Sequence, residues 1–234
     1  MKSDGTEIVK VASGDRAPAY WLPSDEIVHV KGGQLWAVTA QGKKRRILSS
    51  AISLDPMQDD TYLLSPGGER VAYVHGATLA LITIGVSQPG LVTDALISNH
   101  GYRPDLAWSP DGRRLAYVVA APQPQLRICD ADGTNTRVLV DGTERHLRRP
   151  SWFPNNSVLA FSSFPTGSGT FDCCASIFVV NDDGSGLRDL TEDRNPQQFP
   201  ELSPDGKKIA FFRGGNLWVA FLSSGREKCP HRSN

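Results

Sequence analysis

Trp108-Ser109-Pro110-Asp111-Gly112 decides the fold, because related stretches return at a regular spacing along the chain. The other copies are Tyr20-Trp21-Leu22-Pro23-Ser24-Asp25, Leu63-Leu64-Ser65-Pro66-Gly67-Gly68, Ser151-Trp152-Phe153-Pro154-Asn155-Asn156 and Glu201-Leu202-Ser203-Pro204-Asp205-Gly206. Their prolines are separated by 43, 44, 44 and 50 residues. A period of this size is typical of repeat architectures, in which each copy is one small structural unit.

Each copy is followed by short runs rich in β-branched and aromatic residues, which favour strands. The first runs are 26–30, 70–74, 114–118, 158–161 and 208–212. The second runs are 35–39, 78–82, 126–130, 176–180 and 216–221. An Asp/Gly turn and a third run follow most clearly at 136–140 and 187–190. With the residues before each proline, these runs predict four short antiparallel strands per unit.

The turn chemistry and the strand patterns together favour a β-propeller. Proline presets φ at the second position of a tight turn, and glycine tolerates a positive φ. A four-stranded unit that is apolar on both faces must be covered by neighbours, and radial stacking of units does this. A β-sandwich is the alternative, but it gives no reason for a turn that returns every 44 residues. We therefore predict an all-β propeller of five four-stranded antiparallel blades.

The two ends of the chain are expected to share one blade. The last unit has a weak fourth strand, since residues 226–234 are polar, while residues 4–11 contain an Asp-Gly turn and an apolar run. We predict that this N-terminal strand completes the last blade, which would remove two open sheet edges. The propeller is then a single domain over residues 1–228, followed by a polar tail at 229–234.

Trp21, Trp108 and Trp152 share one position of the repeat, and we predict that they pack between neighbouring blades. Cys129 lies in an alternating apolar run and is expected to pack as a small hydrophobe. The four cysteines include no CxxC pair, so neither a zinc site nor a redox site is predicted. No metal and no other cofactor is expected.

The motif Trp-Ser-Pro-Asp-Gly-x-x-Leu-Ala-Tyr-Val at 108–118, followed by Asp-x-Asp-Gly-Thr at 130–134, resembles the WD-like (PD40) repeat of TolB-like propellers. It also resembles the N-terminal propellers of prolyl oligopeptidase-type enzymes. The resemblance covers roughly residues 5–225. It departs from the pattern at Ser24-Asp25, which lacks the glycine, and at Gly67, which replaces the usual aspartate. TolB-like propellers usually have six blades, so a six-bladed or truncated ring is the alternative to five.

Charge and hydropathy exclude several classes of partner. The chain carries 25 Lys and Arg against 25 Asp and Glu, a net charge of zero, which argues against a nucleic-acid binder. The longest apolar stretch, at 79–84, is far too short for a membrane span. Residues 1–7 contain no apolar core of a secretory signal. The family resemblance nevertheless implies a periplasmic or other extracytoplasmic location.

Loops at the mouth of the central channel are the expected binding site. Two loop sets converge there: the loops that enter the inner strands, and the loops that join the second and third strands of each unit, which are the first and second runs given above. The candidate ligand- or partner-binding residues on these loops are Arg16, Lys31, Asp59, Asp60, His75, Arg103, Asp105, Arg148, Arg149, Gln197, Gln198 and Arg213. Positive and negative side chains meet at this rim, and such a mixture could bind a peptide, a carboxylate or a sugar. The alternative is that these are ordinary charged loop residues exposed to solvent, which need no ligand to explain them.

Three functions remain open. The first is a non-catalytic, TolB-like interaction module that binds a protein or a peptide at the channel mouth, because no nucleophile, base and orienting group can be recognised. The second is the propeller of a prolyl oligopeptidase-type hydrolase without its catalytic domain. The third is a small propeller lyase, although only His75 maps to the rim. The sequence predicts no catalytic residue and favours the first function.

Overall fold

The protein is built from β-strands wherever the structure describes regular elements. The computed structural model describes residues 10–14, 18–49, 61–75, 78–85, 90–93, 105–120, 123–166, 175–191 and 196–222. Within these ranges, 19 strands form five antiparallel sheets. The strands follow one another in chain order across each sheet. This pattern confirms the predicted all-β fold built from repeated antiparallel units.

The first two sheets have four strands each. The first contains β1 (Tyr20–Trp21), β2 (Glu26–Lys31), β3 (Gln34–Thr39) and β4 (Arg45–Ser49). The second contains β5 (Thr61–Leu64), β6 (Arg70–His75), β7 (Thr78–Thr83) and β8 (Gly90–Thr93). In both, the predicted first and second runs are the two central strands.

The remaining sheets repeat this plan, except that the last has three strands among the described residues. The third contains β9 (Leu106–Trp108), β10 (Arg114–Val119), β11 (Gln125–Asp130) and β12 (Arg137–Asp141). The fourth contains β13 (Arg145–Trp152), β14 (Val158–Pro165), β15 (Ser176–Asn181) and β16 (Arg188–Asp189). The fifth contains β17 (Gln197–Leu202), β18 (Lys208–Arg213) and β19 (Asn216–Phe221).

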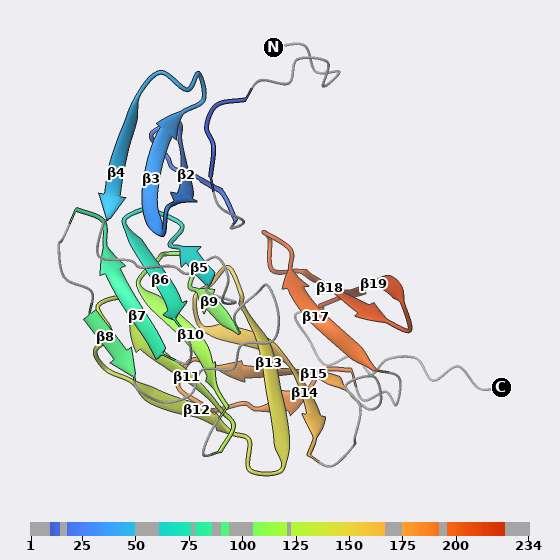
Figure 1. Cartoon of the computed structure of the whole chain (residues 1–234). Helices are drawn as coiled ribbons and strands as arrows, with labels where there is room; N and C mark the ends of the chain where they lie inside the picture. Colours follow the sequence, from blue (N-terminus) through green and yellow to red (C-terminus); the bar gives the residue numbers. More distant parts are fainter. Residues whose placement is uncertain are drawn as a thin grey trace.

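The five sheets follow one another around an arc, with the first and last sheets at its two ends (Figure 1). The strand before each proline turn is the inner one, because β9 contacts β5 and β13, and β13 contacts β17. Each turn closes with the same backbone hydrogen bond, and the residue two positions after the proline has a positive φ. Gly68, Gly112 and Gly206 hold this position in three turns, and Asp25 and Asn156 hold it in the other two.

The hydrophobic core consists of four clusters, each between two consecutive sheets. The second of these, for example, packs Leu81 of the second sheet with Leu115 and Tyr117 of the third. In the part of the chain that the structure describes, no cluster joins the last sheet to the first. The exposed apolar side chains of β19 agree with this, since Leu217 is 65% and Phe221 is 78% exposed.

The predicted closure by the N-terminal strand is not present among the described residues. Residues 8 and 9 of that strand lie outside the described ranges. Lys10 and Val11 belong to no strand, and the Val11 carbonyl accepts a hydrogen bond from Arg45 Nη2 of the first sheet (3.1 Å). Gly42 permits this contact, because a Cβ there would lie 2.8 Å from the same carbonyl oxygen. Among the described residues of this segment, Val11 therefore contacts the first sheet.

Two of the three aligned tryptophans join neighbouring sheets, as predicted. Trp108 Nε1 donates to the Leu63 carbonyl and Trp152 Nε1 donates to the Ala107 carbonyl, both at 3.0 Å. Each acceptor belongs to the inner strand of the preceding sheet. The prediction is wrong for Trp21, which is 59% exposed, and among the described residues no sheet lies before the first one in the arc.

Candidate functional site

A chain of contacts across three sheets joins Asp105, which directly precedes β9, to Arg149 of β13 and Phe199 of β17. Asp105, Arg149 and Phe199 all lie five residues before a turn proline, so they are equivalent in the repeat. Asp105 is fully buried, and its Oδ1 accepts a hydrogen bond from the Arg149 backbone N–H (3.0 Å) and lies 3.7 Å from Arg149 Nε. The Arg149 guanidinium in turn lies 5.1 Å from the centroid of the Phe199 ring. Repeat equivalence therefore brings residues 44 and 50 positions apart into contact.

β-Bulges set the orientation of these side chains. The register of β13 shifts between Arg148 and Ser151, and that of β17 shifts between Gln198 and Glu201. Arg149 and Phe199 lie inside these bulges with φ values of 54° and 58°. Such values are uncommon for residues other than glycine, and bulges near binding sites often redirect a side chain.

A small cavity of about 40 Å³ lies between the fourth and fifth sheets at this point. Ser162 of β14 lines it with a side chain that is only 3% exposed, and its Oγ has no hydrogen-bond partner in the described part of the chain. The other lining residues are Arg148, Arg149, Phe164, Ala175, Gln198 and Phe199. We call these seven residues the arginine pocket. They combine two cations, aromatic walls and an available hydroxyl.

The Arg148 guanidinium lies beside the Phe164 ring, with Cζ 5.5 Å from the ring centroid. Burial lowers the pKa of Arg148, and the Coulombic effect of Arg149 adds to this, while the charge of Asp105 opposes it. Both effects that lower the pKa disfavour the charged form of Arg148. A negatively charged group would therefore be favoured at this position.

The structure brings only some of the predicted rim residues together. Asp105, Arg148, Arg149 and Gln198 meet at the arginine pocket. Gln197 is buried beside it, and its backbone N–H donates to the Ala175 carbonyl (2.7 Å). The residues that lie outside the described ranges are Arg16, Asp59, Asp60 and Arg103.

The other predicted residues lie at strand ends. Lys31 ends β2, with Nζ 5.9 Å from the Trp36 ring centroid. Arg213 ends β18, with Cζ 5.0 Å from the Trp218 ring centroid. His75 ends β6 opposite Thr78, and only its backbone is described.

The position of the arginines within the fold differs from the prediction. Arg148, Arg149, Gln197 and Gln198 were expected in loops, but they lie within β13 and β17. The reason is that β14 continues to Pro165, which extends its pairing with β13 back to Arg145.

Sequence reasoning placed the insertion 164–175 among the channel-mouth loops, but it missed Ser162 and Phe199. Alignment of the repeat on its prolines already places Phe199 at the position of Arg149. The pair Ser162-Ser163 within the apolar run 158–164 was a second signal, because polar residues in a buried strand require a partner.

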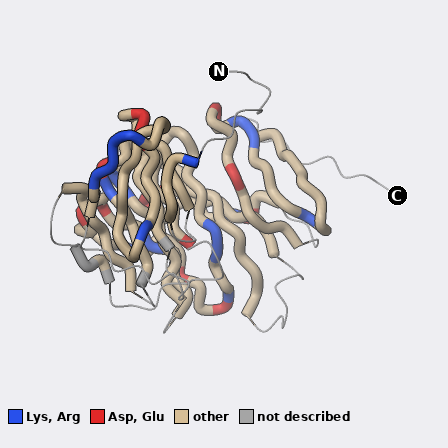
Figure 2. Tube along the Cα trace, turned by 45° about the horizontal axis from the view of Figure 1, so that its top comes forward, with Lys and Arg blue, Asp and Glu red and all other residues tan. Residues whose placement is uncertain are grey.

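No group of three or more His, Cys, Asp or Glu side chains is placed to hold a metal ion in the described ranges. No described helix has the length and apolar character that a bilayer span requires. Lys, Arg, Asp and Glu are interspersed over the sheets rather than separated by sign (Figure 2).

Comparison of the sequence with known proteins points to TolB. No protein-family model matches the chain. It is 36% identical over 123 residues to a protein TolB homolog of Chlorobium luteolum, a match covering 51% of this chain and 26% of the relative. It is 31% identical over 157 residues to an uncharacterised protein of Agrobacterium fabrum, covering 63% and 48% respectively. The chain thus spans between about a quarter and a half of these relatives.

Solved structures show the same fold. A putative TolB from Agrobacterium tumefaciens aligns with a TM-score of 0.59 at 21% identity, covering 88% of this chain and 81% of that one. An oligogalacturonate lyase in complex with manganese aligns with a TM-score of 0.64 at 15% identity, covering 90% and 63%. The chain is therefore a TolB-like β-propeller, in fold and in sequence similarity.

Proposed function

We propose that this chain is a non-catalytic interaction module that binds an extended segment of a protein partner along its inner strands. The observation that carries the proposal is the arginine pocket, where two guanidiniums, two aromatic rings and a buried hydroxyl converge on one cavity. Arginine and aromatic residues are enriched among the side chains that dominate protein interfaces.

The names of the relatives support a protein partner. One of them, from Francisella tularensis, is named Tol-Pal system protein TolB and is 30% identical over 104 residues, or 42% of this chain and 22% of its own length. A periplasmic location goes with this proposal. The two enzyme alternatives gain no support from the described residues, since fold similarity to a lyase carries no catalytic residue with it.

Selection of short random peptides displayed on phage against the immobilised protein tests the proposal. We expect enriched peptides to bind the purified protein at one site and to lose affinity about tenfold when Arg148 is replaced by Gln, because truncation of a central arginine removes a dominant contact.

Arg188→Gln is the matched control, because it removes an exposed arginine from β16 at the outer edge of the same sheet. Circular dichroism and the melting temperature check that both variants fold. The absence of any enriched peptide, or equal losses in the two variants, would contradict the proposal.

A further inference from the structure

We propose that a second cavity, between the third and fourth sheets, binds a small zwitterion with an apolar body: an apolar amino acid, or a short apolar peptide with free ends. The cavity has a volume of about 310 Å³ and lies on the opposite face of the fourth sheet from the arginine pocket. We call it the β12–β13 cleft. The lining residues that carry the inference are Asp141, Glu144, Arg145, Leu147, Phe161 and Ser163.

The floor of the cleft is apolar except for one hydroxyl. Phe161 and Ser163 lie on the same face of β14, because alternate residues of a strand point to the same side. Phe161 belongs to the apolar cluster between the third and fourth sheets, so this face is turned toward the third sheet. Leu147 pairs with Ser163 across the sheet and is 3% exposed. An apolar group of a ligand can therefore be buried here.

Ser163 is the polar exception on this floor, and its side chain is fully buried. Its Oγ lines the cavity and has no hydrogen-bond partner in the described ranges. Such groups are rare in native proteins, because each has lost the hydrogen bonds that it made in water. A ligand oxygen beside Ser163 would restore one of them. The cleft therefore suits a ligand that has a polar group as well as an apolar body.

Charges of both signs lie at the mouth of the cleft. Asp141 ends β12, Arg145 begins β13 and Glu144 lies in the connection between them, and all three are exposed. None of the three forms an ion pair in the part of the chain that the structure describes. The lining thus offers two carboxylates to an ammonium group and one guanidinium to a carboxylate.

The orientation of Arg145 is restricted by an aromatic ring. Its Cζ lies 4.8 Å from the centroid of the Phe178 ring, which stacks on Phe161. Phe178 belongs to β15, so the Arg145 side chain extends from β13 across β14, the strand that carries Ser163. The guanidinium has no hydrogen-bond acceptor among the described residues, and stacking leaves its N–H edge available. A ligand carboxylate can accept hydrogen bonds from this edge.

Asp141 is held in place for an ammonium group. Its Oδ1 accepts hydrogen bonds from the Thr143 backbone N–H (3.1 Å) and the Thr143 hydroxyl (2.7 Å). Its Oδ2 makes no contact within the described ranges and can accept from a ligand. An amine alone would leave Arg145 without a counter-charge, and a carboxylate alone would leave Asp141 and Glu144 without one. A zwitterion supplies both charges.

The size of the cleft limits the ligand to a small molecule. A volume of about 310 Å³ lies at the lower end of the range of about 300–1,000 Å³ that is usual for small-molecule sites. The charged groups are confined to one short connection, while the floor is apolar. The ligand should therefore have its charges at the mouth and its apolar side chain on the floor, as in an apolar amino acid or a short apolar peptide.

Titration of the whole protein with L-leucine, followed by NMR, tests the inference. We expect saturable changes in the Arg145 Nε–H signal, which is identified by its loss in Arg145→Gln. Two analogues each lack one charge: 3-methylbutylamine has no carboxylate, and 4-methylpentanoate has no ammonium. Each should bind at least about tenfold more weakly, because it leaves part of the lining unpaired. Glycine should bind at least about tenfold more weakly as well, because it has no apolar side chain to bury.

Substitutions connect the binding to the cleft. Ser163→Ala should weaken leucine binding roughly three- to tenfold without lowering the melting temperature, because the hydroxyl it removes has no partner in the described ranges. Asp141→Asn should weaken it roughly two- to fivefold, since the amide oxygen can keep the Thr143 contacts but has no charge. Arg113→Gln is the control, because Arg113 lies in the turn between β9 and β10 and outside the cleft lining.

The possible outcomes are distinct. The absence of saturable binding by both leucine and leucyl-leucine would overturn the inference, and so would a one-charge analogue that binds as tightly as leucine. Equal effects of Ser163→Ala and Arg113→Gln would also overturn it. Tighter binding of leucyl-leucine than of leucine would assign the cleft to peptides, and the reverse to free amino acids; both support the inference. The proposed interaction function is tested separately, through Arg148→Gln on the other face of the sheet.

Discussion

The repeat assigns different roles to equivalent residues, depending on where each unit lies in the arc. Trp108 and Trp152 are 8% and 6% exposed, and their indole N–H groups join them to the preceding inner strand. Trp21 has the same place in the sequence pattern and is 59% exposed. The contact therefore depends on the neighbouring sheet and not on the tryptophan alone.

Substitution of these tryptophans by phenylalanine tests this view. Trp152→Phe should lower the free energy of unfolding by about 1–2 kcal/mol, because it removes the indole N–H that donates to the Ala107 carbonyl together with buried, packed atoms. Trp21→Phe should change it by less than about 0.5 kcal/mol, as is usual for exposed positions. Urea denaturation measures both, and equal losses would refute the proposed difference.

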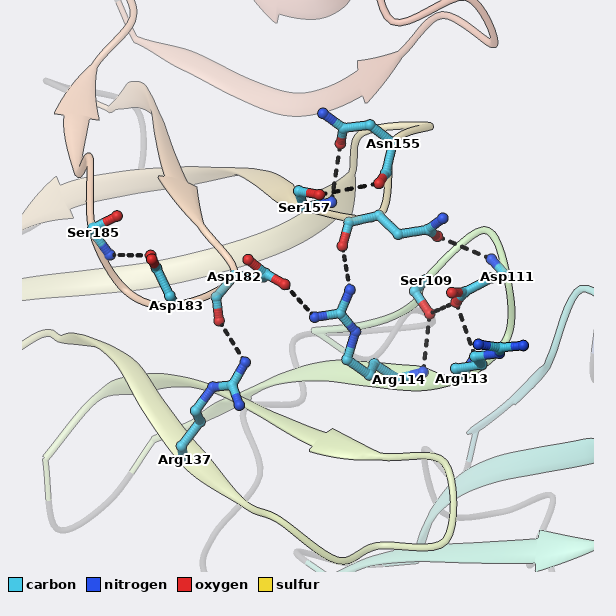
Figure 3. A network of polar contacts seen from close by, with 11 residues as sticks. Ser109, Asp111, Arg113, Arg114, Arg137, Asn155, Ser157, Asp182, Asp183 and Ser185 are labelled. Atoms are coloured by element: carbon cyan, nitrogen blue, oxygen red, sulfur yellow. Dashed lines mark hydrogen bonds and ion pairs between the residues drawn. The ribbon is translucent and has the colours of Figure 1, made fainter.

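The third and fourth sheets are joined by side-chain hydrogen bonds, an ion pair and a close backbone contact. Between the third and fourth sheets, Arg114 forms an ion pair with Asp182 and donates to the Asn156 carbonyl, while Arg137 Nη2 donates to the Asp182 carbonyl at 2.8 Å (Figure 3). At the connection from β12 to β13, the Gly142 N–H donates to the Pro124 carbonyl (2.7 Å). These contacts fix the angle between two sheets that share an apolar cluster.

Gly142 is the most sensitive of these positions, because a Cβ there would lie 2.7 Å from both the Pro124 and the Arg145 carbonyl oxygens. Gly142→Ala should lower the free energy of unfolding by about 1–3 kcal/mol, since the backbone must shift to admit the methyl group. Gly67→Ala is the control, because no atom lies within 4 Å of its Cβ position.

Gly67→Ala should leave stability unchanged or raise it by up to about 1 kcal/mol, because alanine restricts the unfolded chain. Thermal and urea unfolding of the two variants provide the comparison. A Gly142→Ala protein as stable as Gly67→Ala would show that the connection is not tightly packed.

At the scale of the whole molecule, the arc leaves one face of its last sheet exposed. Leu217, Val219 and Phe221 of β19 are 65%, 51% and 78% exposed. Phe212, which pairs with Leu217 across the sheet, is 47% exposed. Contiguous apolar surface of this kind favours association between molecules, and so does a strand at the edge of a sheet.

We expect the isolated chain to self-associate through this face as its concentration rises. The double variant Leu217→Lys with Phe221→Lys should shift the protein toward the monomer, because charges on the face repel a second copy. Val138→Lys with Leu187→Lys is the control, since Val138 of β12 is 45% exposed and Leu187, which directly precedes β16, is 48% exposed. Sedimentation velocity distinguishes the results, and equal association of the two variants would contradict the expectation.

Much of the fold could be predicted because its signals are local. A proline turn, its left-handed residue and the alternation of the flanking strands all lie within one repeat, so β2, β6, β10, β14 and β18 could be located from the sequence. The same alignment placed Asp105, Arg148, Arg149 and Gln198 at equivalent points before the inner strands, and the structure brings them close together.

The rest depended on contacts between distant segments. Sequence alone determined an all-β chain of repeated sheets, because hydrogen bonds within a unit connect residues close in sequence. Only the tertiary structure decided that Ser162 lines the same cavity as the arginines, that Trp21 is exposed and that Val11 contacts the first sheet. The physical reason is that burial and partner choice depend on how neighbouring sheets pack, and a local pattern constrains that packing only weakly.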